Sequence, residues 1–231
     1  MAKNNNLIAM RLSKTHFIGR ILARLPFVRC VILNGSLAQG RSNESSDIDI
    51  LIIAKSGHIF TARFFVNFFA SILRIKRPKD EKKDHSGKFC FNYFLTENYL
   101  KIPTGRGEEM DRYCADNYSH SKFIAGDISL FNKFILVNQG LFSKYNCHPE
   151  ASAEGSSERN ERAAAPRFFT NVQNDIQKIA ERLFRLRFEN WAKHYQIKKI
   201  NTDPRTKKYP ELIVFNDKEL RFHPPKLTNK N

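Results

Sequence analysis

The sequence has little of what disulfide-bonded or zinc-ribbon proteins depend on. Its 231 residues include four cysteines, Cys30, Cys90, Cys114 and Cys147, which are far apart and form no CxxC pair. Neither a disulfide framework nor a zinc ribbon is therefore expected, and this cysteine usage is typical of a cytoplasmic protein. Walker A and HExxH motifs are also missing, and the seven histidines show no metal-ligand spacing.

Long apolar runs are missing as well, so we expect no membrane span. The longest run, residues 59–75, is shorter than a comfortable span and includes polar side chains. Arg63, Asn67, Ser71 and Arg74 recur at helical spacing, which predicts one polar stripe on a helix rich in phenylalanine. A largely buried amphipathic helix is the favoured interpretation, with a membrane-surface helix as the alternative. The N-terminus has too short an apolar run for a signal peptide.

Acidic residues are scarce compared with basic ones. The chain has 39 Lys and Arg against 23 Asp and Glu, which gives a net charge of +16. Such a charge favours polyanionic partners, including nucleic acid, nucleotides and anionic lipid headgroups, and a basic solvated surface is the equally weighted alternative. The apolar share of 41% and charged share of 27% are ordinary for a globular protein and exclude wholesale disorder.

The apolar pattern predicts a mixed α/β first half and a mainly helical second half. We expect helices over residues 14–25, 59–75, 108–123, 127–142 and from about 174, strands over 27–33, 47–54 and 88–96, and a hairpin over 210–225. This divides the chain into a core at 1–100, a helical extension at 101–145, a flexible insertion or linker at 146–167, and a C-terminal helix with a short hairpin at 168–231.

The segment that carries chemistry covers residues 31–54. Gly35-Ser36 ends one apolar strand, and Asp47-Ile48-Asp49 opens the next one. Acids two residues apart on a strand lie side by side and repel each other unless cations bind them, and Mg²⁺ prefers such oxygen ligands together with phosphates. Gly35 lets a phosphate approach the backbone, and Ser36 adds a hydroxyl and an N–H at the expected start of a helical turn. A phosphate cradle facing an acid pair is what nucleotidyl transfer requires.

This pattern resembles the nucleotidyltransferase superfamily, which has the DNA polymerase β-like fold. The matching residues are Leu33, Gly35-Ser36, Asp47-Ile48-Asp49 and Ile50-Leu51-Ile52, and the resemblance extends over about residues 27–95. It implies an α/β (α+β) core with a small mixed sheet and flanking helices.

The resemblance also implies roles for individual residues. Gly35 and Ser36 would hold the β- and γ-phosphates of a nucleoside triphosphate, and Asp47 and Asp49 would be the catalytic acids that bind two Mg²⁺ ions. Arg41, in the spacer between the two motifs, is a further candidate for a phosphate contact, with a solvated loop cation as the alternative.

The third strand departs from the family pattern. A third carboxylate is usual there, but the strand Lys88-Phe89-Cys90-Phe91-Asn92-Tyr93-Phe94-Leu95 has no acid, and Asn92 takes the expected place. An amide can offer a metal one neutral oxygen, but it cannot act as a general base. Substitute acids in the neighbouring sequence are Glu97, Asp84 and Asp80.

Two functions follow from these residues. The first is a Mg²⁺-dependent nucleotidyltransferase that moves a nucleoside monophosphate from a triphosphate to a hydroxyl of a small molecule, a protein or an RNA. The second is a catalytically weak or inactive binding or regulatory module on the same fold, such as an antitoxin-like partner protein. The missing third acid favours the second function, whereas the Gly-Ser motif and both aspartates favour the first.

Overall fold

The computed structural model describes residues 2–78, 84–105, 107–147, 179, 186–208, 210 and 213–222. The strands are β1 (Val28–Asn34), β2 (Ile48–Ala54), β3 (Phe89–Thr96), β4 (Lys122–Gly126), β5 (Val214–Phe215) and β6 (Glu219–Arg221). The helices are α1 (Ala2–Leu22), α2 (Gly35–Ala38), α3 (Ile59–Ile72), α4 (Glu108–Ser119), α5 (Ile128–Lys144), α8 (Leu186–Asn201) and α9 (Pro204–Lys208).

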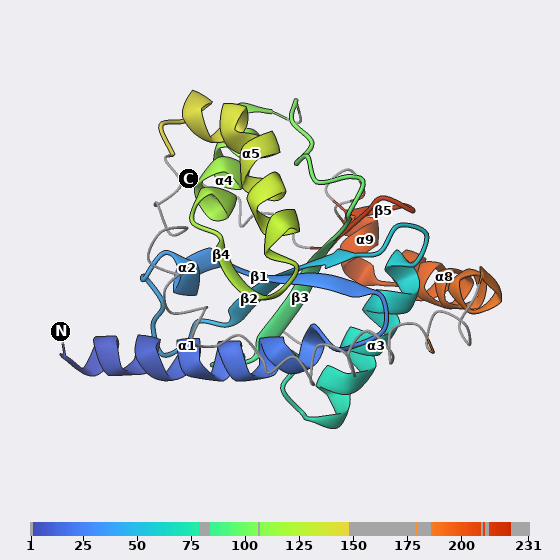
Figure 1. The fold of residues 1–231 in the computed structure, drawn as a ribbon, viewed down its shortest axis with the longest axis horizontal. Coiled ribbons are helices and arrows are strands. Elements are labelled where there is room, and N and C mark those ends of the chain that lie inside the picture. The colour runs from blue at the N-terminus through green and yellow to red at the C-terminus, as the bar shows by residue number, and fades with distance from the viewer. Residues whose placement is uncertain are drawn as a thin grey trace.

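The strands form one mixed sheet in the order β4-β1-β2-β3-β6-β5 (Figure 1). Only β2 and β3 run parallel among its paired strands, and the other pairs are antiparallel. Because a parallel connection needs a crossover, the chain passes through α3 between β2 and β3. The expected mixed α/β fold with flanking helices is confirmed.

Helices cover both faces of this sheet, as Figure 1 shows. On one face, α1 and α3 pack against inward-facing aliphatic side chains such as Val31, Leu33 and Ile52. On the other face, α4 and α5 pack against the alternate set, which includes Ile32 and Leu51. The central strands are buried on both faces, which explains their nearly continuous apolar sequences. Of the helices in the described residues, none has the length and apolarity to cross a membrane.

The prediction of a helix over 108–123 is wrong at its end. Helix α4 stops at Ser119, and the next residues form β4, which pairs with β1 at the edge of the sheet. Gly126 explains the close approach, because its φ is +99° and a Cβ there would overlap the Arg29 carbonyl. Long-range pairing therefore overrides the local helical pattern.

The other predicted elements agree with the structure to different extents. Helix α1 begins at Ala2, well before the predicted start at residue 14, and the hairpin forms within 214–221. Most of the linker predicted at 146–167 lies outside the described residues, as does most of the helix predicted from about 174 up to 185. The division into four segments stays a prediction, although β4 and β6, from two of them, join the core's sheet.

Helix α8 is fixed to α3 by a buried carboxylate. Glu189 Oε1 accepts the backbone N–H of Phe60 at 3.0 Å, and its Oε2 accepts that of Thr61 at 2.7 Å. Helix α3 has no side-chain cap from its own N-cap residue, His58. The first turn of a helix has N–H groups without intrahelical partners, and an acid there is favourable, so Glu189 caps α3 from a distant part of the chain.

We expect Glu189→Ala to destabilise the protein, because two buried N–H groups of α3 lose their acceptor. Each hydrogen bond to a charged group contributes about 1.5–3 kcal/mol to the free energy of unfolding. In a chain of this size, each kcal/mol lost lowers the Tm by about 2–4 °C. Glu108→Ala is the matched control, since Glu108 is 75% exposed and pairs only with Arg112 at 3.5 Å among the described residues. Equal melting temperatures for both variants would contradict the capping role of Glu189.

Candidate functional site

The acid pair lies where β2 begins. Asp47 immediately precedes this strand and Asp49 is its second residue, so both side chains are on the sheet face that α4 and α5 cover farther along. One carboxylate oxygen of each aspartate and the Cys90 Sγ all lie within 4.8 Å of one another. The sequence pattern predicted the aspartates but missed Cys90, which is opposite Asp49 in the parallel register of β2 and β3.

Gly35 lies directly against Asp49. It follows β1 at the first position of α2, with φ at +69°, and a Cβ on it would overlap the Asp49 Oδ2. Asn34, the residue before it, pairs with Asp49 across the strands and accepts a hydrogen bond from Ser121 at 2.8 Å. Ser36, next in this single helical turn, is partly exposed. The Gly-Ser turn and the acid pair are therefore neighbours in space.

Arg77 completes the site from the segment between α3 and β3. Its Nη1 donates to Asp47 Oδ2 at 2.7 Å, and the two side chains are only 23% and 20% exposed. Its Nε donates to His85 Nδ1 at 3.2 Å. The backbone of Lys76 and Arg77 runs beside the start of β3, which positions the guanidinium. Nothing in the sequence around Arg77 distinguished it from its basic neighbours.

Asn92 lies beside the acid pair, where the third acid of the resemblance would be. Its Nδ2 donates to Asp49 Oδ1 at 3.3 Å. Of the proposed substitute acids, Glu97 pairs with Arg29 at the far end of β3, and Asp84 accepts the Ser86 N–H. Asp80 lies outside the described residues. Within the described part of the chain, the cluster thus contains a thiol and an amide but no third carboxylate.

The electrostatics of the site are unfavourable for a second negative charge. Burial and, next, the charge of Asp47 raise the pKa of Asp49 to about 7, although Arg77 and Asn92 act in the opposite direction. Burial and then the charge of Asp49 raise the pKa of Cys90 and of Tyr113 on α4 above their ordinary values. Both groups therefore keep their protons at neutral pH, and a cation is what would stabilise the two carboxylates together.

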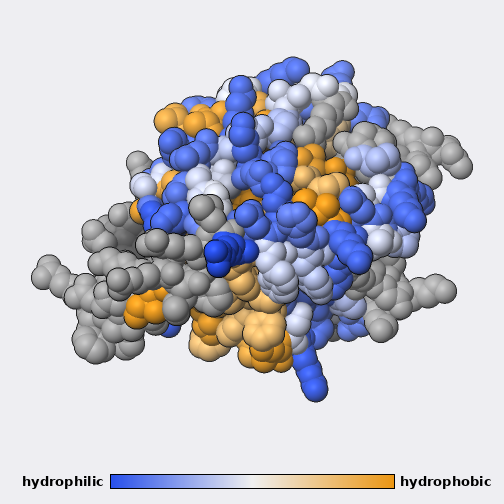
Figure 2. Space-filling view, turned by 90° about the vertical axis from the view of Figure 1, so that its right-hand side faces the viewer, coloured by the Kyte–Doolittle hydropathy of each residue, from blue (hydrophilic) through white to orange (hydrophobic). Residues whose placement is uncertain are grey.

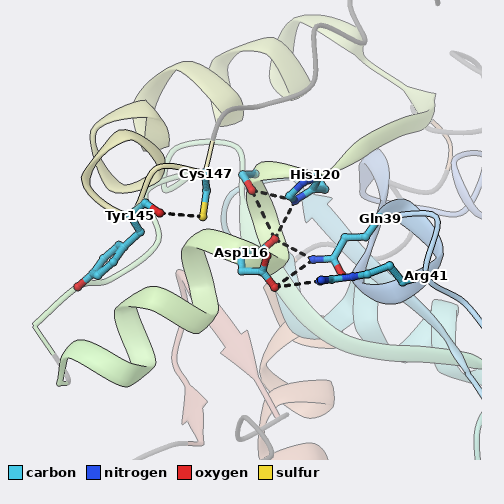
Figure 3. A network of polar contacts seen from close by, with 7 residues as sticks. Gln39, Arg41, Asp116, His120, Tyr145 and Cys147 are labelled. Atoms are coloured by element: carbon cyan, nitrogen blue, oxygen red, sulfur yellow. Dashed lines mark hydrogen bonds and ion pairs between the residues drawn. The ribbon is translucent and has the colours of Figure 1, made fainter.

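Arg41 is held in a separate network shown in Figure 3. Its Nη2 lies 3.2 Å from Asp116 Oδ2 of α4, and its guanidinium also donates to Gln39. Gln39 in turn donates to the Asp116 backbone carbonyl at 2.9 Å. Arg41 and Asp116 are 64% and 50% exposed, so this pair is weak and open to exchange. The structure thus places Arg41 after the Gly-Ser turn but in contact with α4.

We expect Gly35→Ala to damage the acid pair and Gly40→Ala to leave it intact. Both glycines have φ near +70°, so either alanine strains the backbone by roughly 1–2 kcal/mol. Only the new Cβ at position 35 meets Asp49, because nothing lies within 4 Å of a Cβ at position 40. Mn²⁺ binding, followed by electron paramagnetic resonance, should weaken roughly 10–100-fold in Gly35→Ala alone. Equal affinities would mean that Gly35 does not shape the acid site.

We expect Asp49→Asn to stabilise the metal-free protein at alkaline pH. A carboxyl group whose pKa is raised by folding favours the folded state below its ordinary pKa of 3.8, and this stability is lost as pH rises through about 7. In EDTA at pH 8 the variant should melt at least about 2 °C higher than wild type, with the gap closing toward pH 5. Asp116→Asn, at an exposed pair, is the control. A lower melting temperature for Asp49→Asn would show that the charge is already compensated.

The comparisons with known proteins agree with this geometry. The family "Nucleotidyltransferase domain" matches residues 17–100. A solved structure described as "Crystal structure of the toxin-antitoxin with AMP-PNP" is 18% identical and covers 69% of this chain and 98% of its own, but its TM-score of 0.29 is too low to bear on fold or function. Among curated proteins, none matches. Residues 17–100, with the Gly-Ser turn and both aspartates, therefore match the nucleotidyltransferase domain family.

Proposed function

We propose that this protein is a Mg²⁺-dependent nucleotidyltransferase that transfers a nucleoside monophosphate from a triphosphate to an acceptor hydroxyl. The observation that carries the proposal is the position of Asp47 and Asp49, side by side against Gly35 with a raised pKa at Asp49. Two such carboxylates lower the stability of the fold unless they hold cations. Nucleotidyltransferase domains in general use nucleoside triphosphates and divalent metals.

The donor set of the site fits Mg²⁺. Asp47 and Asp49 supply hard carboxylate oxygens, and Asn92 can turn its amide oxygen toward the same place. Cys90 stays a protonated thiol through burial, so it lines the site and leaves the ion to oxygen ligands. Two bound Mg²⁺ ions would activate the acceptor hydroxyl and neutralise the charge of the triphosphate and the departing pyrophosphate.

The residues of the chain have separate roles in this proposal. Gly35 and Ser36 bind the β- and γ-phosphates through the backbone and hydroxyl of the turn. Arg77 orients Asp47 through their ion pair, and Arg41 becomes available to phosphate when its exposed pair with Asp116 opens. The acceptor oxygen forms a bond to the α-phosphorus, the bond between this phosphorus and its bridging oxygen breaks, and pyrophosphate leaves with the electron pair. The hydroxyl proton passes to water next to the carboxylates.

A second candidate function is a nucleotide-binding module that carries out no transfer. Asn92 favours it, because an amide cannot take the proton of the acceptor. The two functions differ in one observable, since both require nucleotide binding and only the first requires a new phosphodiester or phosphoester bond. Transfer of the α-phosphate is therefore the decisive measurement.

We expect wild-type protein to bind at least one nucleoside triphosphate more tightly in Mg²⁺ than in EDTA, as measured by isothermal titration calorimetry. The double variant Asp47→Asn/Asp49→Asn keeps the side-chain shapes but removes the ligand charges, so the Mg²⁺-dependent binding should disappear. Transfer of label from an α-³²P triphosphate to candidate acceptors then separates the enzyme from the binding module. Folded wild-type protein that binds no triphosphate would overturn both functions.

A further inference from the structure

A cavity of about 360 Å³ lies between α3, α8 and β3, and some of its lining residues also contact the acid pair. Its walls come from α3, α8, the segment around Arg77 and the first half of β3. Arg77 and Asn92 line it, and both also contact the acid pair, through Asp47 and Asp49 respectively. The volume is within the range of small-molecule sites. On the face where α3, α8 and α9 lie, hydrophobic patches break the hydrophilic surface (Figure 2).

Basic groups outnumber acidic groups along this cavity. Arg63, Lys76, Arg77 and Lys199 line it, and Asp203 is the one acid among its described lining residues. Asp47 already compensates Arg77, but Arg63 and Lys199 outnumber Asp203 among the described lining residues and leave an excess of positive charge. A cavity of this composition attracts anions and repels polycations.

Arg63 is the most informative of these cations. Its Nη1 donates to the neutral Gln196 Oε1 at 2.6 Å, and its guanidinium lies 4.2 Å from the centre of the Phe222 ring. Its Nε has no hydrogen-bond partner in the part of the chain that the structure describes. Burial lowers its pKa to about 10, so it still carries a charge at neutral pH. Within the described residues it has no carboxylate partner. A cation desolvated in this way is incomplete without an anion.

Aromatic side chains form the rest of the wall. Phe64 of α3 and Tyr195 of α8 line the cavity, and Tyr195 is 49% exposed. Tyr195 stacks on Trp191, the single tryptophan of the chain, with ring centres 5.7 Å apart and planes 6° from parallel. An exposed ring beside cations is the combination that binds bases and phosphates of single-stranded nucleic acid.

We propose that this cavity binds the acceptor, and that the acceptor is a nucleotide unit with a 5′-phosphate, either free or at the end of a strand. Its phosphate lies on Arg63 and Lys199, its base stacks on Tyr195, and its ribose hydroxyl points past Asn92 to the acids. This assignment rests on the proposed function for the direction of transfer, because that hydroxyl oxygen forms the new bond to the α-phosphorus as pyrophosphate leaves. Polycationic acceptors, such as amino sugars, do not fit the charge of the cavity.

The single tryptophan provides a local test in EDTA, where the acid site does not hold Mg²⁺. Adenosine 5′-monophosphate and a short 5′-phosphorylated oligoadenylate are titrated separately while Trp191 fluorescence is recorded. We expect saturable quenching with at least one of the two probes. Tighter binding of the oligonucleotide identifies a strand end as the acceptor, and equal or tighter binding of the mononucleotide identifies the free nucleotide.

Matched variants locate the binding. Lys199→Gln should weaken it roughly tenfold or more, the change expected when one charge-assisted hydrogen bond is lost. Lys198→Gln, the neighbouring exposed lysine that does not line the cavity, should bind like wild type. Asn67→Phe places a large side chain in the cavity and should abolish binding, with circular dichroism and melting temperature confirming the fold. If both lysine variants bind equally, or if neither probe binds wild type, the proposal is wrong.

The double variant Asp47→Asn/Asp49→Asn separates the two proposals. It should keep the quenching by adenosine 5′-monophosphate in EDTA, because the cavity does not need the carboxylates to bind. Loss of this quenching would place the probe in the triphosphate site and overturn the cavity assignment. Quenching that persists while wild type binds no triphosphate in Mg²⁺ would instead overturn the proposed transfer, and the cavity would remain a nucleotide-binding site.

Discussion

Repulsion between Asp47 and Asp49 is the constraint to which the rest of the core is fitted. Each carboxylate raises the free energy of the other, and burial at the start of β2 prevents water from screening their charges fully. The rest of β2, Ile50–Ala54, is aliphatic and fully buried. Its hydrophobic burial offsets the free energy of the repulsion between the two carboxylates. Arg77 compensates one carboxylate directly, and Asn92 donates a weaker bond to the other. The fold therefore holds two mutually repelling carboxylates together at a cost to its own stability.

The C-terminal part of the chain, outside the matched residues 17–100, forms one wall of the cavity. On β3, hairpin strand β6 pairs with Tyr93–Leu95, so in the described residues it does not extend along the first half of that strand. One residue beyond β6, the Phe222 backbone N–H donates to the Asn92 carbonyl at 2.9 Å. Helix α8, which Glu189 holds against α3, forms part of the cavity wall. Residues 186–222 thus shape access to acids that belong to residues 17–100.

The sequence predicted what depends on local periodicity and missed what depends on distant pairing. Apolar patterns of fixed spacing predict the central strands and the Phe-rich helix, and the two motifs follow from their place at the ends of those strands. The structure has all of these elements. Strand β4 was missed, because its first two residues fall in the helix predicted over 108–123 and the strand forms only by pairing with β1. Arg77 is 30 residues from Asp47, and its place depends on the turn after α3. Cys90 required the register between β2 and β3.

The neutral Asn92 is consistent with an anionic acceptor. It contacts Asp49 and lines the cavity, so a carboxylate at this position would lie against Asp49 and add a negative charge to the wall of a cavity for which we propose an anionic ligand. Like charges in such a partly buried place raise each other's free energy, whereas an amide adds no charge and can still donate or accept. In the proposed binding mode, the acids at one end and the cations along the other walls would orient a nucleotide in one direction. The reversed direction would bring its phosphate against Asp47 and Asp49, where repulsion opposes binding.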